Sequence, residues 1–324
     1  MTVTKSPIGF MAKMNSSVLY VVTPEFGKFK ATQARGAGQC ETGEHEFAIK
    51  TEYKTVAGTR IRFADNGKQD APVVLLLCPL PQSIICYDPI WSTLAEKYRV
   101  VALDLPGFGR SEGGVEFMNF KAQGEFLEKF VNDMGLKNIH IIGPDVGMPS
   151  ALYYAIHQKH EIASLMVGDG PGVLPSANGS IINKAVDSAF WRLVFVVTGA
   201  QTFVNGAYRL ACQNYVPNAA EVADYVASYE NGRIGPITAK WFKEYPENLA
   251  TIDPHLESLD IPTLLFWGDK DIFLTTDNAE RLHQRLPKSK LNIFENCGHF
   301  SYQDKPDEFA QMVIDWVDGG YTEI

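Results

Sequence analysis

The feature that most constrains the fold of this chain is the pentapeptide Gly143-Pro-Asp-Val-Gly147, which lies between an apolar run, 139–142, and a segment with a helical pattern, 148–157. A direct strand-to-helix turn holds its central residue in strained backbone geometry. Glycines on either side remove the Cβ atoms that would collide as the chain folds back on itself. The pattern therefore predicts Asp145 at the tip of a sharp turn, and a role as helix N-cap alone would explain neither glycine.

Around this turn the sequence alternates strand-like and helix-like segments from residue 46 onward. Residues 47–53 and 60–64 alternate with period two and meet near Ala57-Gly58, which predicts an antiparallel hairpin with one wet face. Short apolar runs are typical of strands buried on both faces of a parallel sheet, and strands are predicted at 73–77, 100–103, 139–142, 165–167, 263–267 and 290–294. Apolar residues at helical spacing predict helices at 90–98, 117–134, 148–157, 276–286 and 306–317.

The alternation breaks over residues 172–257, which are rich in aromatic side chains and mostly helical in pattern. We interpret this segment as a helical cap inserted over one end of the sheet. The core then comprises 46–171 and 258–324, because strand and helix patterns resume after the insertion. Residues 1–45 form an N-terminal arm, for which packing across a homodimer interface is one hypothesis.

Composition limits the partners and the compartment. The net charge is −9, and no block of Lys and Arg could follow a phosphate backbone, so we expect no nucleic-acid partner. Five cysteines, an odd number without a C-x-x-C pair, favour reduced thiols over a disulfide framework or a zinc site. No apolar run has the length of a membrane span or of a signal peptide, although the basic, acid-poor N-terminus leaves a transit peptide as an alternative. We expect a cytoplasmic protein without membrane association, metal or organic cofactor.

Four other motifs accompany the turn, each at the end of a predicted strand or shortly after it: Leu76-Leu-Cys-Pro-Leu-Pro-Gln82, Asp104-Leu-Pro-Gly-Phe-Gly-Arg-Ser111, Trp267-Gly-Asp-Lys-Asp271 and Asn296-Cys-Gly-His-Phe300. With these motifs in this order, the chain from about 46 to 317 resembles the α/β-hydrolase family, in which nucleophile, acid and histidine follow one another along the chain. Esterases and lipases of this family carry serine at the turn. The aspartate here resembles the branch of epoxide hydrolases and haloalkane or haloacetate dehalogenases. The resemblance implies an α/β-hydrolase fold, with a mostly parallel eight-stranded sheet flanked by helices and a helical cap.

The resemblance also implies a catalytic triad. An ionised Asp145 would attack carbon directly and form an alkyl ester, since a carboxylate needs no base to activate it. His299 would act as general base on the water that hydrolyses this ester. Asp271 would orient the imidazole. Asp169, in Val167-Gly-Asp-Gly170, is the alternative acid because some relatives with an aspartate nucleophile place their acid after the strand that precedes the cap.

Negative charge develops on an Asp145 oxygen when water attacks the ester, so hydrogen-bond donors should face it. In the family these donors are backbone N–H groups at the positions that match Val146 and Leu80. The pair Cys78-Pro79 departs from the family's His-Gly, and proline has no amide hydrogen. A shift of this loop by one residue would therefore remove the second donor.

The residues beside the turn also bear on the leaving group. Haloalkane dehalogenases have a Trp directly after the nucleophile and commonly an Asn in the oxyanion loop, and haloacetate dehalogenases have an Arg after the nucleophile. This chain has Val146 and Leu80 at these places, and neither side chain can donate to a halide. The lack of these halide donors argues against a dehalogenase function.

Epoxide opening needs an acid near the developing alkoxide, which relatives supply from the cap. Tyr215 and Tyr245 are the candidates in this cap, whereas Phe242 stands near a position where the family has tyrosine. Trp191 and Trp241 are expected to wall an apolar substrate pocket, although aromatic side chains in a small lid equally form its own core.

Three functions follow. We favour an epoxide hydrolase that acts on a small apolar electrophile through a covalent Asp145 ester. A dehalogenase with halide donors from the cap, such as Trp191 or Trp241, is the first alternative. A non-catalytic small-molecule receptor on the same fold is the second, because the altered Cys78-Pro79 loop would permit it.

Overall fold

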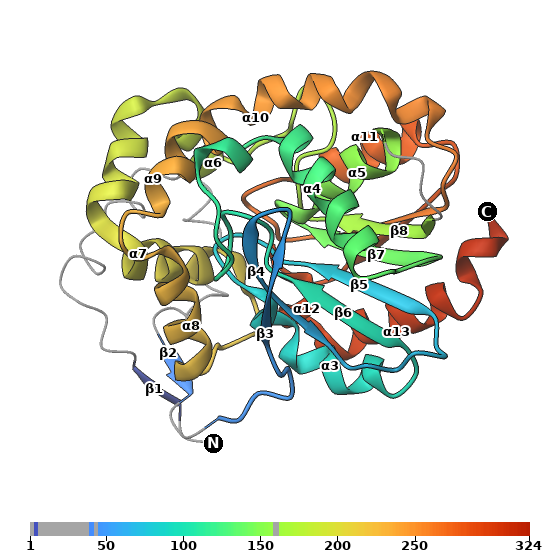
Figure 1. Cartoon of the computed structure of the whole chain (residues 1–324). Coiled ribbons are helices and arrows are strands. Elements are labelled where there is room, and N and C mark those ends of the chain that lie inside the picture. Colours follow the sequence, from blue (N-terminus) through green and yellow to red (C-terminus); the bar gives the residue numbers. More distant parts are fainter. Residues whose placement is uncertain (1–2, 6–38, 42–44, 158–161) are drawn as a thin grey trace.

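The computed structural model describes residues 3–5, 39–41, 45–157 and 162–324. Its centre is an eight-stranded sheet in the order β10-β9-β8-β7-β5-β6-β4-β3 (Figure 1). Neighbouring strands are parallel except where β4 meets β3 and β6. The strands are β3 (Glu52–Val56), β4 (Thr59–Asp65), β5 (Val73–Leu77), β6 (Arg99–Leu103), β7 (Ile139–Pro144), β8 (Ile162–Gly168), β9 (Thr263–Gly268) and β10 (Ser289–Phe294). The predicted mostly parallel, eight-stranded sheet is confirmed.

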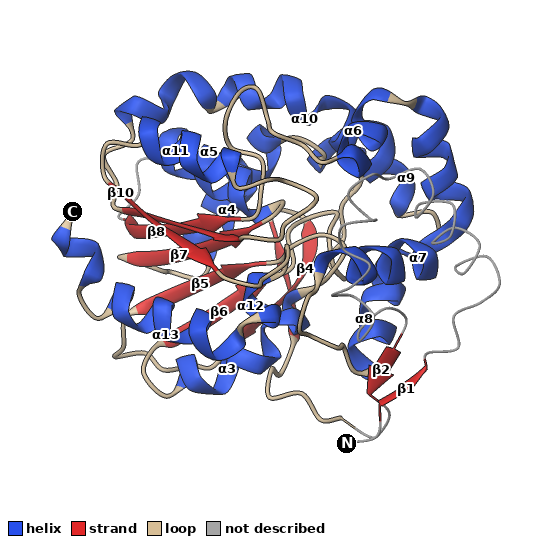
Figure 2. Ribbon diagram, turned by 180° about the vertical axis from the view of Figure 1, so that it is seen from behind, coloured by secondary structure: helices blue, strands red, loops and turns tan. Residues whose placement is uncertain are grey.

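Helices cover both faces of this sheet, as a parallel sheet requires. On one face α4 packs on α5 and α11 lies along β9 and β10, and on the other face α3 packs with α13 (Figures 1 and 2). These helices are α3 (Asp88–Ala95), α4 (Phe120–Asp133), α5 (Gly147–His157), α11 (Asp277–Arg285) and α13 (Pro306–Val317), with the short α12 (Ser301–Asp304) and the 3₁₀ turns η1 (Ile84–Tyr87), η2 (Val115–Phe117) and η6 (Gly320–Glu323).

A run of helices between β8 and β9 lies beyond one end of the strands (Figure 2). We refer to residues 172–257 as the cap. It contains α6 (Ser180–Asp187), α7 (Ala189–Ala211), α8 (Ala219–Tyr229), α9 (Ile234–Pro236), the π-helix η3 (Ile237–Phe242), α10 (Lys243–Asn248), η4 (Leu249–Thr251) and most of η5 (Asp253–Ser258). Helix α7 is kinked at Gly199, whose φ is 80°. None of the described helices combines the length and apolar character needed to cross a bilayer.

The N-terminal arm is described only in part. β1 (Val3–Lys5) pairs antiparallel with β2 (Gln39–Glu41), apart from the large sheet. Most of the predicted arm, 1–45, lies outside the described residues, so its suggested role at a dimer interface stays a hypothesis.

The first strand of the hairpin is displaced from its predicted place at 47–53, because β3 spans Glu52–Val56. The turn Ala57-Gly58, in which both φ angles are positive, sets the pairing of β3 with β4 at the far end of the hairpin. The residues before β3 leave the sheet, since the backbone N–H of Ile49 donates to the carboxylate of Asp88 at the start of α3 (3.2 Å).

One helix begins later than its periodicity predicts. Helix α4 starts at Phe120 rather than at 117 because Asn119 is its N-cap, with Oδ1 accepting from the backbone N–H of Ala122 (2.8 Å). A side chain that satisfies a free N–H fixes a helix end more sharply than apolar spacing does.

A buried ion-pair cluster joins the cap to the core. The guanidinium of Arg62, on β4, donates from Nε to Asp104 Oδ2 (2.7 Å) and from its two terminal nitrogens to Asp224 on α8 (2.7 and 3.0 Å). Ser83 adds a hydroxyl bond to Asp224 (2.6 Å). Because Arg62 is only 3% exposed, the charge balance of this cluster depends on α8 staying in place.

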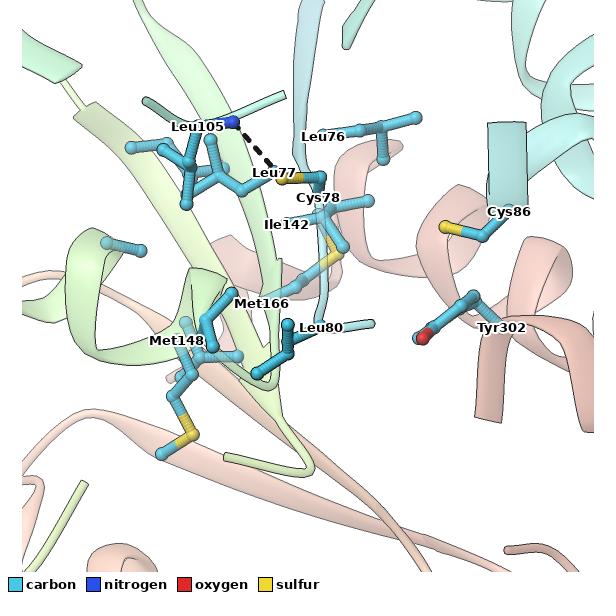
Figure 3. Packing of buried hydrophobic residues seen from close by; sticks show 14 of the residues in the cluster. Leu76, Leu77, Cys78, Leu80, Cys86, Leu105, Ile142, Met148, Met166 and Tyr302 are labelled. Carbon is cyan, nitrogen blue, oxygen red and sulfur yellow. Dashed lines mark hydrogen bonds between the residues drawn. The ribbon is translucent and has the colours of Figure 1, made fainter. Parts of the chain in front are cut away.

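The core around the carboxyl end of β5 is closely packed (Figure 3). There Cys78 lies fully buried, and its Sγ accepts a hydrogen bond from the backbone N–H of Leu105 (3.1 Å). Burial raises the pKa of this thiol well above its usual range, which favours an inert thiol. The other cysteines whose side chains are described, Cys86, Cys212 and Cys297, are also buried and unpaired.

Candidate active site

Asp145 lies at the tip of the turn from β7 into α5, with φ at 49°. A Cβ on Gly143 would lie 2.6 Å from the backbone oxygen of Gly147, and a Cβ on Gly147 would lie 2.9 Å from the Cβ atom of Leu77. Real Cβ atoms do not make contacts this short, so both positions exclude larger residues. The Asp145 carbonyl accepts the N–H of Met148 (3.1 Å) and thereby starts the helix. The turn thus holds the carboxylate above the end of the sheet.

His299 and Asp271 come from loops after β10 and β9 and meet beside Asp145. His299 Nε2 is 3.7 Å from Asp145 Oδ1, and Nδ1 is 2.7 Å from Asp271 Oδ2. The other oxygen of Asp271 accepts the backbone N–H groups of Phe273 and Leu274 (2.8 and 3.1 Å). The loop after β9 therefore fixes the Asp271 carboxylate and leaves one oxygen for the imidazole.

Asp169, the alternative acid, lies at the end of β8 and points elsewhere. Its carboxylate accepts from Ser301 Oγ (2.7 Å) and from the backbone N–H of Gly268 (3.2 Å). Burial, and then the charge of Asp271, raise the pKa of Asp169 well above its usual range. In the structure the Nδ1 atom of His299 is hydrogen-bonded to Asp271, and the carboxylate of Asp169 does not reach that atom.

The charge on the histidine follows from these neighbours. Burial alone would lower the pKa of His299, but the negative charges of Asp271 and Asp145 outweigh it and hold this pKa well above its usual range. These two carboxylates therefore favour the protonated imidazole in the free protein.

The two predicted oxyanion donors differ in the structure. The backbone N–H of Leu80 donates to Asp145 Oδ2 (2.6 Å), so Pro79 has not displaced the loop by one residue. Val146 is buried in the turn, and within the described part of the chain its N–H makes no hydrogen bond to the carboxylate. One donor therefore holds the carboxylate before any reaction.

The side chains of Asp145 and His299 line a cavity of about 100 Å³ between the core and the cap. Its walls are almost entirely apolar, and the polar side chains among them, besides these two, are Thr198 and Thr202 of α7. The apolar walls come from the loop after β5, from α6, α7 and η3, and from the loops after β9 and β10: Leu80, Pro81, Ile181, Ile182, Ala185, Phe195, Phe203, Gly206, Ala207, Leu210, Phe242, Phe273, Leu274 and Phe300.

The four cap side chains expected near substrate are not among the described residues that line this cavity. The hydroxyl of Tyr215 donates to Glu221 (2.7 Å), and that of Tyr245 bonds to Asn178. Trp241 packs against two core phenylalanines, and Trp191, in the first turn of α7, packs edge-to-face against Phe190. These aromatic side chains join the cap to the core or fill the cap itself, which corrects their expected place in the pocket.

The sequence reasoning missed the pocket wall that α7 supplies. After the kink, Thr202, Phe203, Gly206, Ala207 and Leu210 face the cavity together. These positions recur at three or four residues, which is the spacing of one helical face and was the available signal in the sequence. Phe242, noted for lacking a hydroxyl, does line the cavity.

Among the described residues no group of three or more His, Cys, Asp or Glu side chains could hold a metal ion. The site brings together a carboxylate, an imidazole and a backbone N–H beside an apolar cavity.

Comparisons with known proteins identify the fold family. Residues 72–306 match the family model of the alpha/beta hydrolase fold. Among curated relatives, 2-hydroxy-6-oxononadienedioate/2-hydroxy-6-oxononatrienedioate hydrolase 1 of Dechloromonas aromatica is 25% identical over 241 residues, which are 69% of this chain and 78% of that protein. An enzyme of the same description, numbered 2, from Pseudomonas putida is 24% identical over 237 residues, with the same shares.

Solved structures show the same architecture. A membrane phospholipase A, a bacterial virulence factor, superposes with a TM-score of 0.69 at 25% identity over 95% of both chains. Haloalkane dehalogenase DbeA from Bradyrhizobium elkani gives 0.74 at 19% identity over 84% of this chain and 98% of its own, and epoxide hydrolase CorEH gives 0.69 at 22% identity over 82% and 98%. At such identities the last two show the fold alone. Because the family model spans most of the chain, including the turn at Asp145 and the loop of His299, this protein is a member of the α/β-hydrolase family.

Proposed function

We propose that this protein hydrolyses a small, neutral, apolar epoxide through a covalent ester on Asp145. One observation carries the proposal. The carboxylate of Asp145, on a strained turn, lines an apolar cavity, and His299 Nε2 lies 3.7 Å from its Oδ1 atom. A serine at this place would need a base before it could attack, whereas an ionised carboxylate attacks carbon as it stands.

In the first step an Asp145 oxygen attacks an epoxide carbon, and the ring C–O bond breaks with its electron pair left on oxygen. Thr202 lies on the cap side of the cavity, and no hydrogen bond of its hydroxyl is found among the described residues, so it is free to donate to this alkoxide. After rotation about the C–C bond, the alkoxide takes the imidazolium proton of His299. The products of this step are a hydroxyalkyl ester and a neutral imidazole.

In the second step His299 takes a proton from water, and the hydroxide adds to the ester carbonyl. The resulting oxyanion can accept from the N–H of Leu80, which already contacts this carboxylate. Collapse breaks the bond to the alkoxide, which takes the proton of the regenerated Asp145 carboxyl. The diol leaves, and the ion pair between Asp145 and His299 is restored without any outside proton.

Ester formation itself prepares the base. The negative charge of Asp145 is one of the influences that hold the pKa of His299 high, and esterification removes it while burial continues to favour the neutral ring. Esterification therefore favours the neutral imidazole, which is the form that can accept a proton from water.

The lining of the cavity bears on the substrate class. The described residues that form it include no Lys or Arg, and the imidazole of His299 already faces the carboxylates of Asp145 and Asp271, so a carboxylate of the substrate would be left without a partner. The dioate substrates in the names of the curated relatives do not suit this cavity. A neutral and apolar molecule is therefore proposed.

The test combines product analysis with trapping. Purified protein is incubated with styrene oxide and small aliphatic epoxides, and in parallel with 1-bromohexane, and diol and halide are measured. In the proposed reaction diol forms, a single turnover in H₂¹⁸O places ¹⁸O in the Asp145 carboxylate, and His299→Gln accumulates a substrate-sized adduct on the Asp145 peptide. Asp145→Ala is the matched control and should show neither product nor adduct. Saturable binding of an epoxide without turnover or adduct would instead identify a receptor and overturn the proposal.

A further inference from the structure

Asp304, at the end of α12, accepts hydrogen bonds from four backbone N–H groups. Oδ1 accepts from Gln213, Asn214 and Tyr215 (3.0, 2.6 and 2.9 Å), and Oδ2 accepts from Gln213 and from Gly298 (2.9 and 2.7 Å). Three of these donors belong to the cap segment after α7, and the fourth directly precedes His299. The carboxylate therefore ties the end of α7 to the histidine loop.

Burial makes this contact unusual for a charged group. Asp304 is 3% exposed, and among the described residues no Lys, Arg or His nitrogen lies within 4.0 Å of its carboxylate. Backbone N–H groups are thus what solvates the charge, and a buried carboxylate left without such donors is costly. The cap segment and the histidine loop are held to one another by the need to satisfy this single group.

Two further contacts lie along the same junction. The backbone N–H of His299 donates to the carbonyl of Ala211, the last residue of α7 (2.8 Å). The side chains of Asn214 and Asn296 join the cap segment to the histidine loop, with Asn214 Nδ2 donating to the Asn296 carbonyl (2.7 Å). The two segments lie so close together that position 298 has no room for a side chain, because a Cβ on Gly298 would lie 1.6 Å from the Ala211 carbonyl oxygen.

We propose that Asp304 is a positioning residue that sets His299 for ester hydrolysis and couples this position to the cap. The nucleophile is held by different contacts: Asp145 N donates to the Gly168 carbonyl (3.0 Å), and its side chain accepts from Leu80. Loss of Asp304 therefore displaces the base more than the nucleophile. The inference rests on the covalent route proposed above, because only that route separates attack from hydrolysis.

Asp304→Asn provides the test, since it keeps the shape and removes one acceptor oxygen. The amide NH₂ would then face an N–H of the cap segment or of Gly298. A displacement of the base of about 1 Å slows a step on the order of 10²-fold. We expect attack on styrene oxide at nearly the wild-type rate, a diol release slowed by about that factor, and accumulation of the alkyl-enzyme. Asp307→Asn, an exposed acid three residues later, is the matched control and should behave as wild type.

Quenched reactions of the wild type, Asp304→Asn and His299→Gln are compared by intact-protein mass. An adduct in both variants supports the inference. An adduct in His299→Gln but not in Asp304→Asn refutes the inference about Asp304 and leaves the proposed function standing. This holds whether Asp304→Asn is fully active or has lost attack and hydrolysis equally. Absence of adduct in both overturns the covalent route itself. If Asp304→Asn does not fold, Asn214→Ala is the second variant, because it removes only the side-chain link between the cap segment and the histidine loop. It should show the same adduct at a lower level. Absence of the adduct in Asn214→Ala would count against the inference.

Discussion

Replacing Asp224 by alanine should destabilise the protein by about 3–5 kcal/mol, because it leaves a buried guanidinium partly unpaired. Asp224 on α8 accepts two bonds from Arg62 and one from Ser83, at 2.7, 3.0 and 2.6 Å. The side chain of Arg62 is 4% exposed and that of Asp224 is 14% exposed, so water can replace little of what is lost. The remaining partner of the guanidinium, Asp104, contacts only Nε.

The magnitude follows from these contacts. A hydrogen bond to a charged group contributes roughly 1.5–3 kcal/mol, which gives an upper limit of several kcal/mol for the three bonds of Asp224. Relaxation and the partial access of water reduce this sum toward the 3–5 kcal/mol typical of a broken buried pair. Such a loss is a large fraction of the roughly 5–15 kcal/mol by which native proteins are stable.

Urea unfolding monitored by circular dichroism measures the loss. The midpoint should fall at an unchanged m-value, and Asp224→Asn, which keeps one acceptor oxygen, should lie between the wild type and Asp224→Ala. Glu125→Ala is the control, because its pair with Lys121 is exposed (44% and 64%) and is expected to contribute at most about 1 kcal/mol. A loss under about 1 kcal/mol for Asp224→Ala at equal m-value would refute the reasoning that the cap is fixed to the core by this cluster.

Three other predictions concern the turn, the acid and the pH dependence. Gly143→Ala should be strongly destabilising in thermal unfolding, since its Cβ would lie 2.6 Å from a backbone oxygen, whereas Gly206→Ala, with nothing within 4 Å, should be harmless; equal melting temperatures would count against the turn geometry. Asp271→Asn should lower diol turnover on the order of 10³–10⁴-fold and Asp169→Asn far less, and the reverse order would reassign the acid. Burial, opposed by the Asn218 N–H and the Tyr215 hydroxyl, raises the pKa of Glu221 from 4.5 to about 7, so its stabilising contribution is complete below pH 4.5 and is lost as the pH rises to about 7. The unfolding free energy should fall across this range by about 3 kcal/mol more in the wild type than in Glu221→Gln, and parallel pH profiles would disprove it.

The order of elements and the position of the turn could be read from the sequence because their causes are local. Apolar runs bounded by turn residues predicted every strand of the parallel part of the sheet, and the structure confirms them with shifts of a few residues. Asp145 could be placed at a strained turn because Gly143 and Gly147 remove atoms that would collide there. Where a boundary was wrong, as at the start of α4, a capping side chain had overridden the periodicity.

Contacts between segments far apart in the sequence could be decided only by the tertiary structure. Asp169 and Asp271 both follow strands whose carboxyl ends lie side by side, so the sequence favoured Asp271 as partner of the histidine but left Asp169 as an alternative. The choice was made by the N–H groups of Phe273 and Leu274, which hold the Asp271 carboxylate toward Nδ1. The same holds for the cap. Composition predicted an apolar lid, and the spacing from Thr202 to Leu210 marks one face of α7, but that this face lines the cavity depends on how the lid packs against the core.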